Sequence, residues 1–246
     1  MREILSDLVA EEQSLDQFLQ KINPRDWKKT RVWHGWTVQQ VVSHLASSEE
    51  YAFNALAESG SRLREVEDHG SVDALNESAL LPGRDMRPQD VIEWWRGARA
   101  KVVEELSKLQ PADRVPWFHG DMSARSFATA RLMENWAHGL DVYEAVEEEP
   151  EDTLRLRHIA WLGWKSLPHV FAEAGIEYPE PIQVVLMGPE YSKWTFGSTD
   201  SPNAVRGQAG EWCRIAVGRM NPEDATTLRV EGDVAKLALE HVRAHL

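Results

Sequence analysis

The chain has 246 residues, of which 42% are apolar, so it can form one large or two ordinary domains around a real core. Its 40 Asp and Glu outnumber 27 Lys and Arg, which gives a formal net charge of −13 at pH 7. Nucleic acids and anionic membranes both require a basic surface, so this charge argues against either as a main partner.

Two further observations concern the compartment. No apolar run reaches the roughly 18 residues of a transmembrane helix, and the acidic, amphipathic start MREILSDLVAEEQSL is unlike a signal peptide. Cys213 is the single cysteine, which excludes a disulfide framework and predicts a small core residue rather than a nucleophile. We expect a cytoplasmic protein, either a monomer or a homodimer.

Apolar residues at helical spacing dominate the first part of the chain. Asn23-Pro24 ends the first expected helix, and Thr37 caps the second. Pro88 begins the third, and Pro168 bends the last of these helices. The polar stretch 60–87 predicts a connection with one short helix. The stripes predict helices over residues 1–22, 37–59, 88–109, 123–146 and 152–174.

The pattern changes after residue 178. Short β-type runs over 182–187 and 192–196 precede a helix over 208–219, an extended run near 227–230 and a last helix over 233–245. The sequence therefore predicts a mostly helical protein with two domains. Residues 1–178 would form a helical bundle and residues 179–246 a small α+β domain.

The chemistry-bearing pattern is Glu-x-x-x-His on the helix over 123–146, formed by Glu134 and His138. Residues four apart on a helix point from the same face, so this pair can hold one metal ion from one side. His44, on the apolar side of the helix over 37–59, could supply a third ligand. Two histidines and a carboxylate leave a coordination position open, as in catalytic metal sites.

A simpler interpretation fits the same pattern. Glu134 and His138 could be a pair on a helix surface, and His44 a core histidine with a satisfied hydrogen bond, because two-ligand motifs are common in helices. Asp141, one turn after His138, could accept a hydrogen bond from its imidazole or be an exposed acid. Aromatic residues near the motif, such as Trp33, are also ordinary core filler; the others are Trp36, Trp117 and Trp136.

The runs GWTVQQVVSHLA and ARLMENWAHGLDV resemble the mycothiol-dependent maleylpyruvate isomerase family of the DinB-like superfamily. The resemblance implies a four-helix bundle that holds a divalent metal through His44, Glu134 and His138. The tail from about Pro181 resembles the family's C-terminal domain, which is similar to sterol-carrier-like α+β folds. The run CRIAVGR there implies that Arg219 is a catalytic residue offered to the site. The segment MSARSFATARLMENWAHGLDV is closest to a branch described only as metal-binding proteins.

Three functions stay open. The resemblance implies a transferase or isomerase that uses a small thiol such as mycothiol and an electrophilic, carboxylate-bearing substrate, with Arg219, Arg125 or Arg131 binding the carboxylate. The second is a metal-assisted hydrolase, with His119 or Asp141 as general base. The third is a non-enzymatic protein that binds an apolar ligand.

The metal itself is not fixed by the ligand types. Zinc is the first expectation for two histidines and a carboxylate, and nickel, iron or manganese are alternatives. A structural metal normally has four protein ligands, and the further histidines that could complete such a set are His34, His158 and His169.

Overall fold

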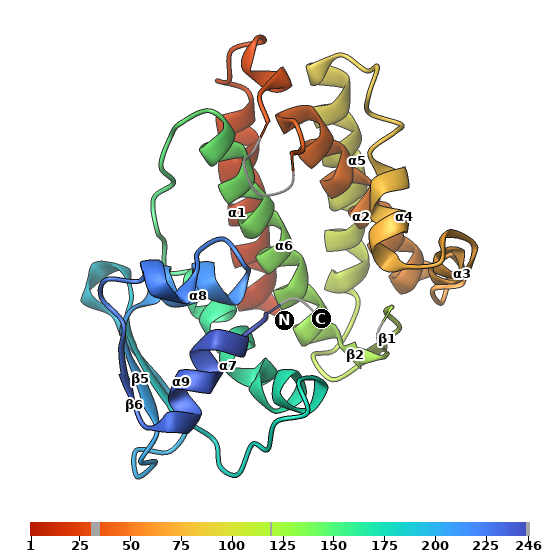
Figure 1. Ribbon diagram of the computed structural model, residues 1–246. Helices are drawn as coiled ribbons and strands as arrows, with labels where there is room; N and C mark the ends of the chain where they lie inside the picture. The colour runs from red at the N-terminus through yellow and green to blue at the C-terminus, as the bar shows by residue number, and fades with distance from the viewer. Residues whose placement is uncertain (31–34, 119, 245–246) are drawn as a thin grey trace. The chain divides into compact units, whose positions relative to one another are not determined.

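The computed structural model describes residues 1–30, 35–118 and 120–244, apart from the side chain of Asp73. Contacts divide the chain into two compact units, Met1–Pro150 and Glu151–Leu246 (Figure 1). The sequence analysis set the boundary at 178/179, after the fifth long helix. That helix, α7 (Leu156–Glu173), packs on the later helices α8 and α9 and so belongs to the second unit by its contacts.

The first unit is built on long helices that match the apolar stripes of the sequence. Helix α2 contacts both α5 and α6, and α1 contacts the same two helices, so the four form a bundle. Short elements lie between them. In chain order the elements are α1 (Arg2–Leu19), η1 (Asp26–Lys28), α2 (Val38–Ala57), η2 (Ser61–Arg64), α3 (Glu65–His69), α4 (Val72–Ala79), α5 (Pro88–Ser107), β1 (Arg114–Val115), β2 (Met122–Ser123) and α6 (Ala124–Ala145).

Local signals fix where the important helices begin. Thr37 caps α2: its hydroxyl accepts a hydrogen bond from the backbone N–H of Gln40, and the Gln40 side chain accepts one from the Thr37 N–H at 2.8 Å. This reciprocal capping satisfies donors that the first turn leaves unpaired. Ser123 caps α6 by accepting a hydrogen bond from the backbone N–H of Ser126, and Pro88 occupies the first turn of α5. The start of each helix sets which later residues face inward.

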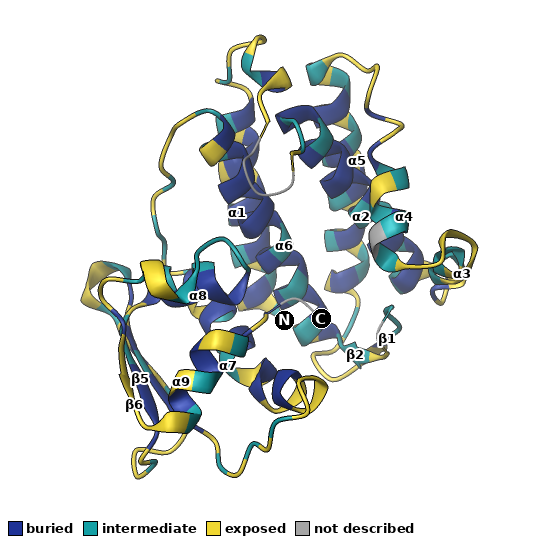
Figure 2. Ribbon diagram, in the orientation of Figure 1, coloured by how far each residue is buried: buried dark blue, intermediate teal, exposed yellow. Residues whose placement is uncertain are grey.

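Apolar side chains from the predicted stripes fill the bundle, whose inner surfaces are buried (Figure 2). One cluster joins α1, α2, α5 and α6 through residues with exposures of a few per cent or less, which are Leu15, Leu19, Trp27, Val38, Val41, Val42, Leu45, Ala46, Val91, Ile92, Trp95, Val142 and Ala145. This core does not include the metal-ligand candidates. The fold of the bundle therefore has a hydrophobic basis of its own.

The second unit contains a small mixed sheet. Strand β3 (Gln183–Met187) pairs antiparallel with β4 (Lys193–Phe196) and parallel with β5 (Ala204–Gln208), which pairs antiparallel with β6 (Arg229–Glu231). The remaining elements are η3 (Pro189–Tyr191), α8 (Ala209–Ala216), η4 (Pro222–Asp224) and α9 (Asp233–His241). These observations confirm the predicted mostly helical fold with a small C-terminal α+β part.

Cys213 of α8 is fully buried, and burial raises the pKa of its thiol well above the usual range. Its sulfur donates a weak hydrogen bond to the carbonyl of Leu156 at 3.6 Å. A buried thiol of raised pKa is inert, so Cys213 is a packing residue, as the sequence predicted. No helix among the described residues is long and apolar enough to cross a membrane.

The structure adds elements that the sequence analysis did not predict. Strand β5 lies where no strand was predicted, and its sequence AVRGQ lacks a run of β-branched residues. The stretch 60–87 contains two short α-helices, α3 and α4, where one was expected. Strands β1 and β2 form a two-stranded ribbon just before α6. Each of these elements is short, and β5 depends on strands distant in sequence.

A group of polar side chains is buried between the bundle helices. Glu12 of α1 and Glu49 of α2 are almost fully buried, and each has one carboxylate oxygen without a hydrogen-bond partner in the described structure. Burial and the nearby charge of Glu49 raise the pKa of Glu12 to about 9, although Arg99 and Arg131 act in the opposite direction. Glu12 is therefore a neutral carboxylic acid at pH 7.

Replacing Glu12 should change how stability depends on pH. Its carboxyl has a pKa of about 9 in the folded protein, against 4.5 for an ordinary glutamate. Between these values the unfolded chain gives up the proton and the folded chain keeps it, so this group lowers stability as pH rises. We expect the unfolding free energy of Glu12→Gln relative to wild type to rise by on the order of 4 kcal/mol between pH 5 and pH 8, because glutamine has no proton to lose.

Urea unfolding of both proteins at the two pH values measures this difference. Glu67→Gln is the control, because Glu67 is exposed on α3. A difference between wild type and Glu12→Gln that is the same at pH 5 and pH 8 would contradict a protonated Glu12.

Candidate metal centre

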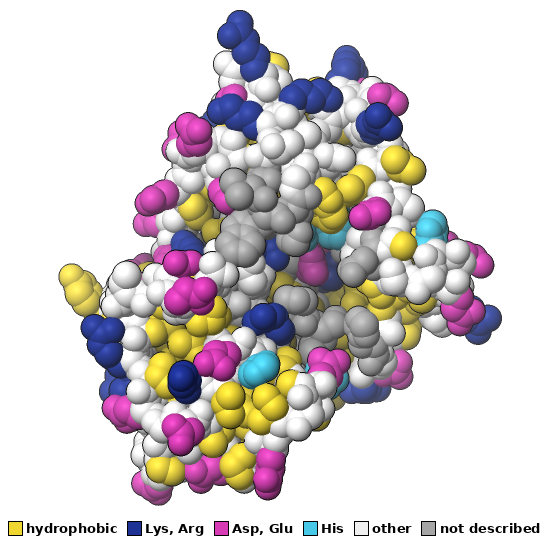
Figure 3. Space-filling model, in the orientation of Figure 1, with side chains coloured by type: hydrophobic (Ala, Val, Ile, Leu, Met, Phe, Trp, Pro, Cys, Tyr) yellow, Lys and Arg dark blue, Asp and Glu magenta, His cyan; other side chains and the backbone are white. Residues whose placement is uncertain are grey.

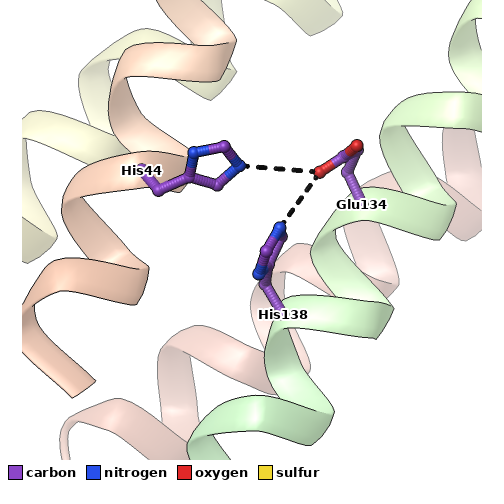
Figure 4. Close-up of side chains that lie close together, drawn as sticks. All are labelled: His44, Glu134 and His138. Carbon is purple, nitrogen blue, oxygen red and sulfur yellow. Dashed lines mark ion pairs between the residues drawn. The ribbon is translucent and has the colours of Figure 1, made fainter. Parts of the chain in front are cut away.

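Helices α2 and α6 bring the three predicted ligands together, as Figure 4 shows. His44 comes from the first half of α2, and Glu134 and His138 project from successive turns of α6. The Glu134 Oε2 atom lies 3.3 Å from His138 Nε2 and 3.9 Å from His44 Nε2. A carboxylate oxygen thus lies between two imidazole nitrogens from different helices.

This donor set fits a divalent ion. One ligand atom from each of the three side chains lies within 4.8 Å of the others. Ligands held at about 2.0–2.2 Å around one tetrahedral ion lie roughly 3.3–3.6 Å from each other, so small side-chain movements would complete the arrangement. The group contains two nitrogens and one carboxylate oxygen, which leaves a position for a ligand that is not part of the protein.

The centre is sheltered but not sealed. The side chains of His44 and His138 are 7% and 11% exposed, while that of Glu134 is 23% exposed. The Trp36 ring lies beside both imidazoles, with its centroid 5.3 Å from the His44 ring and 6.2 Å from the His138 ring. A small molecule can therefore approach from the Glu134 side, while an aromatic wall shields the histidines.

The charges of the centre are strongly coupled. Burial would raise the pKa of Glu134, but the contacts with His138 and His44 and the charges of His138 and Arg131 hold that pKa well below its usual range. For His44, burial lowers the pKa and outweighs the effect of the nearby Glu134 carboxylate. An ionised carboxylate and a neutral imidazole are the forms that bind metal ions.

Asp141 contacts one of the three ligand candidates. Its Oδ2 atom lies 3.0 Å from Nδ1 of His138, and the carboxylate is buried. Burial lowers the pKa of His138, but the hydrogen bonds and charges of Asp141 and Glu134 outweigh it and raise the pKa. A carboxylate on the far nitrogen of a ligand histidine fixes its ring and tautomer. Nδ1 of His44, in contrast, is buried without a partner among the described residues.

Several other predicted residues have partners of their own or lie on an exposed surface. Arg219 follows α8 in the second unit and donates a hydrogen bond to the carbonyl of Val217 at 2.7 Å. His158 and His169 are on α7, where His169 is half exposed and pairs with Glu173. Arg125 is exposed at the start of α6. Trp33, His34 and His119 lie outside the described residues.

Sequence reasoning missed part of the surroundings of the centre. Ser48 lies one turn after His44 on α2, and its hydroxyl accepts a hydrogen bond from Arg131 of α6 at 2.7 Å. Asn135, next to Glu134, donates to Glu49 at 3.2 Å. The helical spacing of Ser48 and His44 was visible in the sequence, but nothing in it showed that Ser48 meets Arg131.

A separate pocket of about 410 Å³ lies along α2 and α5, and Phe53, Trp94 and Lys101 are among its lining residues. The metal-ligand candidates do not line it. On the face drawn in Figure 3, acidic and basic side chains are scattered among hydrophobic ones. Neither feature offers a chemistry as specific as the three convergent ligands.

Comparison with known proteins connects this geometry with a family. The profile described as the mycothiol maleylpyruvate isomerase N-terminal domain matches residues 8–143, which contain all three ligand candidates. Two uncharacterized proteins of Mycobacterium tuberculosis, from strains CDC 1551 and H37Rv, are each 32% identical over 226 residues. In both cases the alignment covers 87% of this chain and 84% of the relative.

Solved structures share the fold. The crystal structure of the mycothiol-dependent maleylpyruvate isomerase has a TM-score of 0.60 at 17% identity and covers 93% of this chain and 92% of the other. A point mutant of that enzyme has a TM-score of 0.59 at the same identity, with 92% of both chains covered. At this identity the likeness establishes the fold alone. By the extent of the profile match and the relatives at 32% identity, the chain belongs to the mycothiol maleylpyruvate isomerase family.

Proposed function

We propose that this protein is a divalent-metal enzyme that uses a small thiol of the mycothiol type to isomerise, or transfer the thiol to, an electrophilic small molecule bearing a carboxylate. The observation that carries the proposal is the convergence of His44, Glu134 and His138 around one point, with the Glu134 side partly open to solvent. Membership of the family supports thiol dependence. A solved protein of the same fold is a mycothiol-dependent maleylpyruvate isomerase.

Each residue of the centre has a distinct task in this proposal. His44, Glu134 and His138 would hold the ion, with zinc expected first and nickel, iron or manganese as alternatives. Asp141 keeps the His138 ring in place through its 3.0 Å contact. Trp36 limits the access of water to the two imidazoles. A bound divalent ion would lower the pKa of a coordinated thiol, so that the reactive thiolate forms near neutral pH.

The alternatives receive less support from the geometry. A hydrolase would need a general base beside the ion, and the described candidate, Asp141, is buried and engaged with His138. His119 lies outside the described residues. A purely structural metal would normally have four protein ligands, whereas the described group contains three.

The first test concerns metal content. Protein purified without chelator or a histidine tag should contain about one divalent ion per chain, and alanine at His44, Glu134 or His138 should remove most of it, because each loses one of three protein ligands. Asp141→Asn should bind the ion about 10- to 100-fold more weakly, since it loses only the orienting carboxylate.

Elemental analysis and competition with a chromogenic chelator give these values. His169→Ala is the matched control, because it removes a histidine that is half exposed on α7. Full occupancy in His138→Ala would show that the assignment of ligands is incorrect.

The second test separates a catalytic ion from a structural one. Removal of the metal with a chelator should leave the helical circular dichroism signal intact, because the bundle core has its own apolar packing. Thiol binding should be lost at the same time and should return on addition of metal. Collapse of the helical signal would favour a structural metal.

The third test concerns the thiol. In cobalt-substituted protein, binding of mycothiol should produce a sulfur-to-metal charge-transfer band, which nitrogen and oxygen ligands do not give. The resting protein should lack the band, since its only cysteine, Cys213, is buried in α8. Arg219→Ala should retain the band, and we expect it to weaken only an acidic second substrate. No band with any physiological thiol, together with ester or amide hydrolysis, would favour the hydrolase.

A further inference from the structure

Arg131 lies in the layer of the bundle next to the metal centre. It precedes Glu134 by three residues on α6, and its hydrogen-bond partner Ser48 follows His44 by four residues on α2. Residues three and four apart share a helix face, about 5 Å apart along its axis. The Arg131–Ser48 pair is therefore the neighbouring bridge between the same two helices that supply the ligands.

The surroundings hold the Arg131 guanidinium in place. Its central carbon lies 4.9 Å from the Trp117 ring centroid and 5.8 Å from that of Phe127, and the residue is 3% exposed. The Ser48 hydroxyl accepts a hydrogen bond from Nη1 at 2.7 Å. Stacking on aromatic faces orients a guanidinium while leaving its edge for hydrogen bonds. The side chain is thus fixed before any ligand binds.

The hydrogen-bonding capacity of this guanidinium is largely unused. It carries five N–H donors. In the part of the chain that the structure describes, the Ser48 hydroxyl is its hydrogen-bond acceptor, and Nε is buried without a partner. Arg99 of α5, which is partly buried, differs: it donates to a carboxylate oxygen of Asp16 and to the Glu12 carbonyl. A buried donor without an acceptor is costly unless a ligand supplies one.

The charges around Arg131 leave room for an anion. The charge of Arg131 lowers the pKa values of three carboxyl groups. In two of them, Glu12 and Glu49, burial outweighs this effect and the pKa is raised. The third, Glu134, is a ligand candidate whose charge a bound metal would take up. The positive groups nearby are Arg99 of α5, which acts on both buried glutamates, and the metal centre itself. Among the described residues, Arg131 donates its hydrogen bond to the Ser48 hydroxyl rather than to a carboxylate.

We propose that Arg131 is the anion-binding residue of the metal centre and takes the carboxylate of the small molecule held there. The planar guanidinium edge matches a carboxylate in a two-point contact. This inference rests on the proposed function and names a residue on the same helix as two of the metal ligands. The bound molecule must carry a carboxylate about 5 Å, one helical turn, from the group that binds the metal. The substrate class is therefore defined by this spacing as well as by its negative charge.

A merely structural role predicts a different result. If Arg131 only balanced Glu49 and Glu134, its replacement would weaken every ligand of the metal equally, through loss of folding stability or of metal. If Arg131 binds an anion, its replacement weakens ligands with a carboxylate and leaves neutral ones unchanged. The two roles are therefore separated by a pair of ligands that differ only in that group.

The experiment uses cobalt-loaded full-length protein and two thiols of equal chain length, 3-mercaptopropionate and 3-mercapto-1-propanol. The charge-transfer band reports binding of each thiol, and the ratio of the two Kd values is the readout. Wild type should prefer the carboxylate about 10- to 100-fold, the range for hydrogen bonds to a charged group. Arg131→Gln should lose most of this preference and bind 3-mercapto-1-propanol as wild type does.

Matched variants complete the design. Arg125→Gln removes an exposed arginine from the same helix and should keep the wild-type ratio. Arg131→Lys should restore part of the preference, since it keeps the charge but not the two-point geometry. If Arg131→Gln does not fold, Arg131→Lys carries the test through the same ratio. Metal content and Tm are measured for each variant, so that a loss of metal is not taken for a loss of anion binding.

The outcomes separate this inference from the proposed function. A wild-type band without preference for the carboxylate, or a preference that survives in Arg131→Gln, overturns the role of Arg131 and leaves the thiol-dependent metal centre standing. Equal weakening of both thiols in Arg131→Gln with metal retained also overturns it. Absence of a band with either thiol in metal-loaded wild type contradicts the proposed function, and the role of Arg131 with it.

Discussion

The contact on which the site depends is the Glu134 carboxylate between two imidazoles from different helices. Removing a carboxylate from water is costly, and the low pKa of Glu134 shows that His138 and His44 outweigh that cost. The same Glu134 oxygen lies 3.9 Å from Nε2 of His44 on α2 and 3.3 Å from Nε2 of His138 on α6, so the two helices meet at this point. A divalent ion at this point would replace these contacts with stronger ones and bind a ligand on the open side.

The bundle separates packing from chemistry. The apolar cluster that joins the long helices holds the fold, and the polar residues form a second group along the α2–α6 contact. Within that group, successive helical turns carry different tasks. His44 and Glu134 form one bridge between α2 and α6, at the proposed metal site, and Arg131 with Ser48 forms the neighbouring bridge. A rigid pair of helices therefore sets the spacing between the metal-binding group and the charge of a ligand.

Features that depend on residues close together in the chain were predictable from the sequence, and features that depend on distant residues were not. The starts of α2 and α5 were predictable because Thr37 and Pro88 act on their own first turns. The pairing of Glu134 with His138 was predictable because the two residues lie one turn apart on the same helix. That His44 meets this pair depends on how two distant helices pack. Its place on the apolar side of its helix suggested this, and the resemblance to a family supported it.

Two features were out of reach for sequence reasoning, each because its partners are distant in the chain. Strand β5 forms because β3 and β6 pair with it. Glu12 lies among residues that look solvent-facing, and its burial becomes visible only when the helices are assembled.

Anomalous diffraction at the absorption edge of the bound metal is the most direct test of the proposed metal site. The account predicts one peak about 2.0–2.2 Å from Nε2 of His44, Oε2 of Glu134 and Nε2 of His138. A peak elsewhere, or a fourth protein ligand at this one, would contradict it.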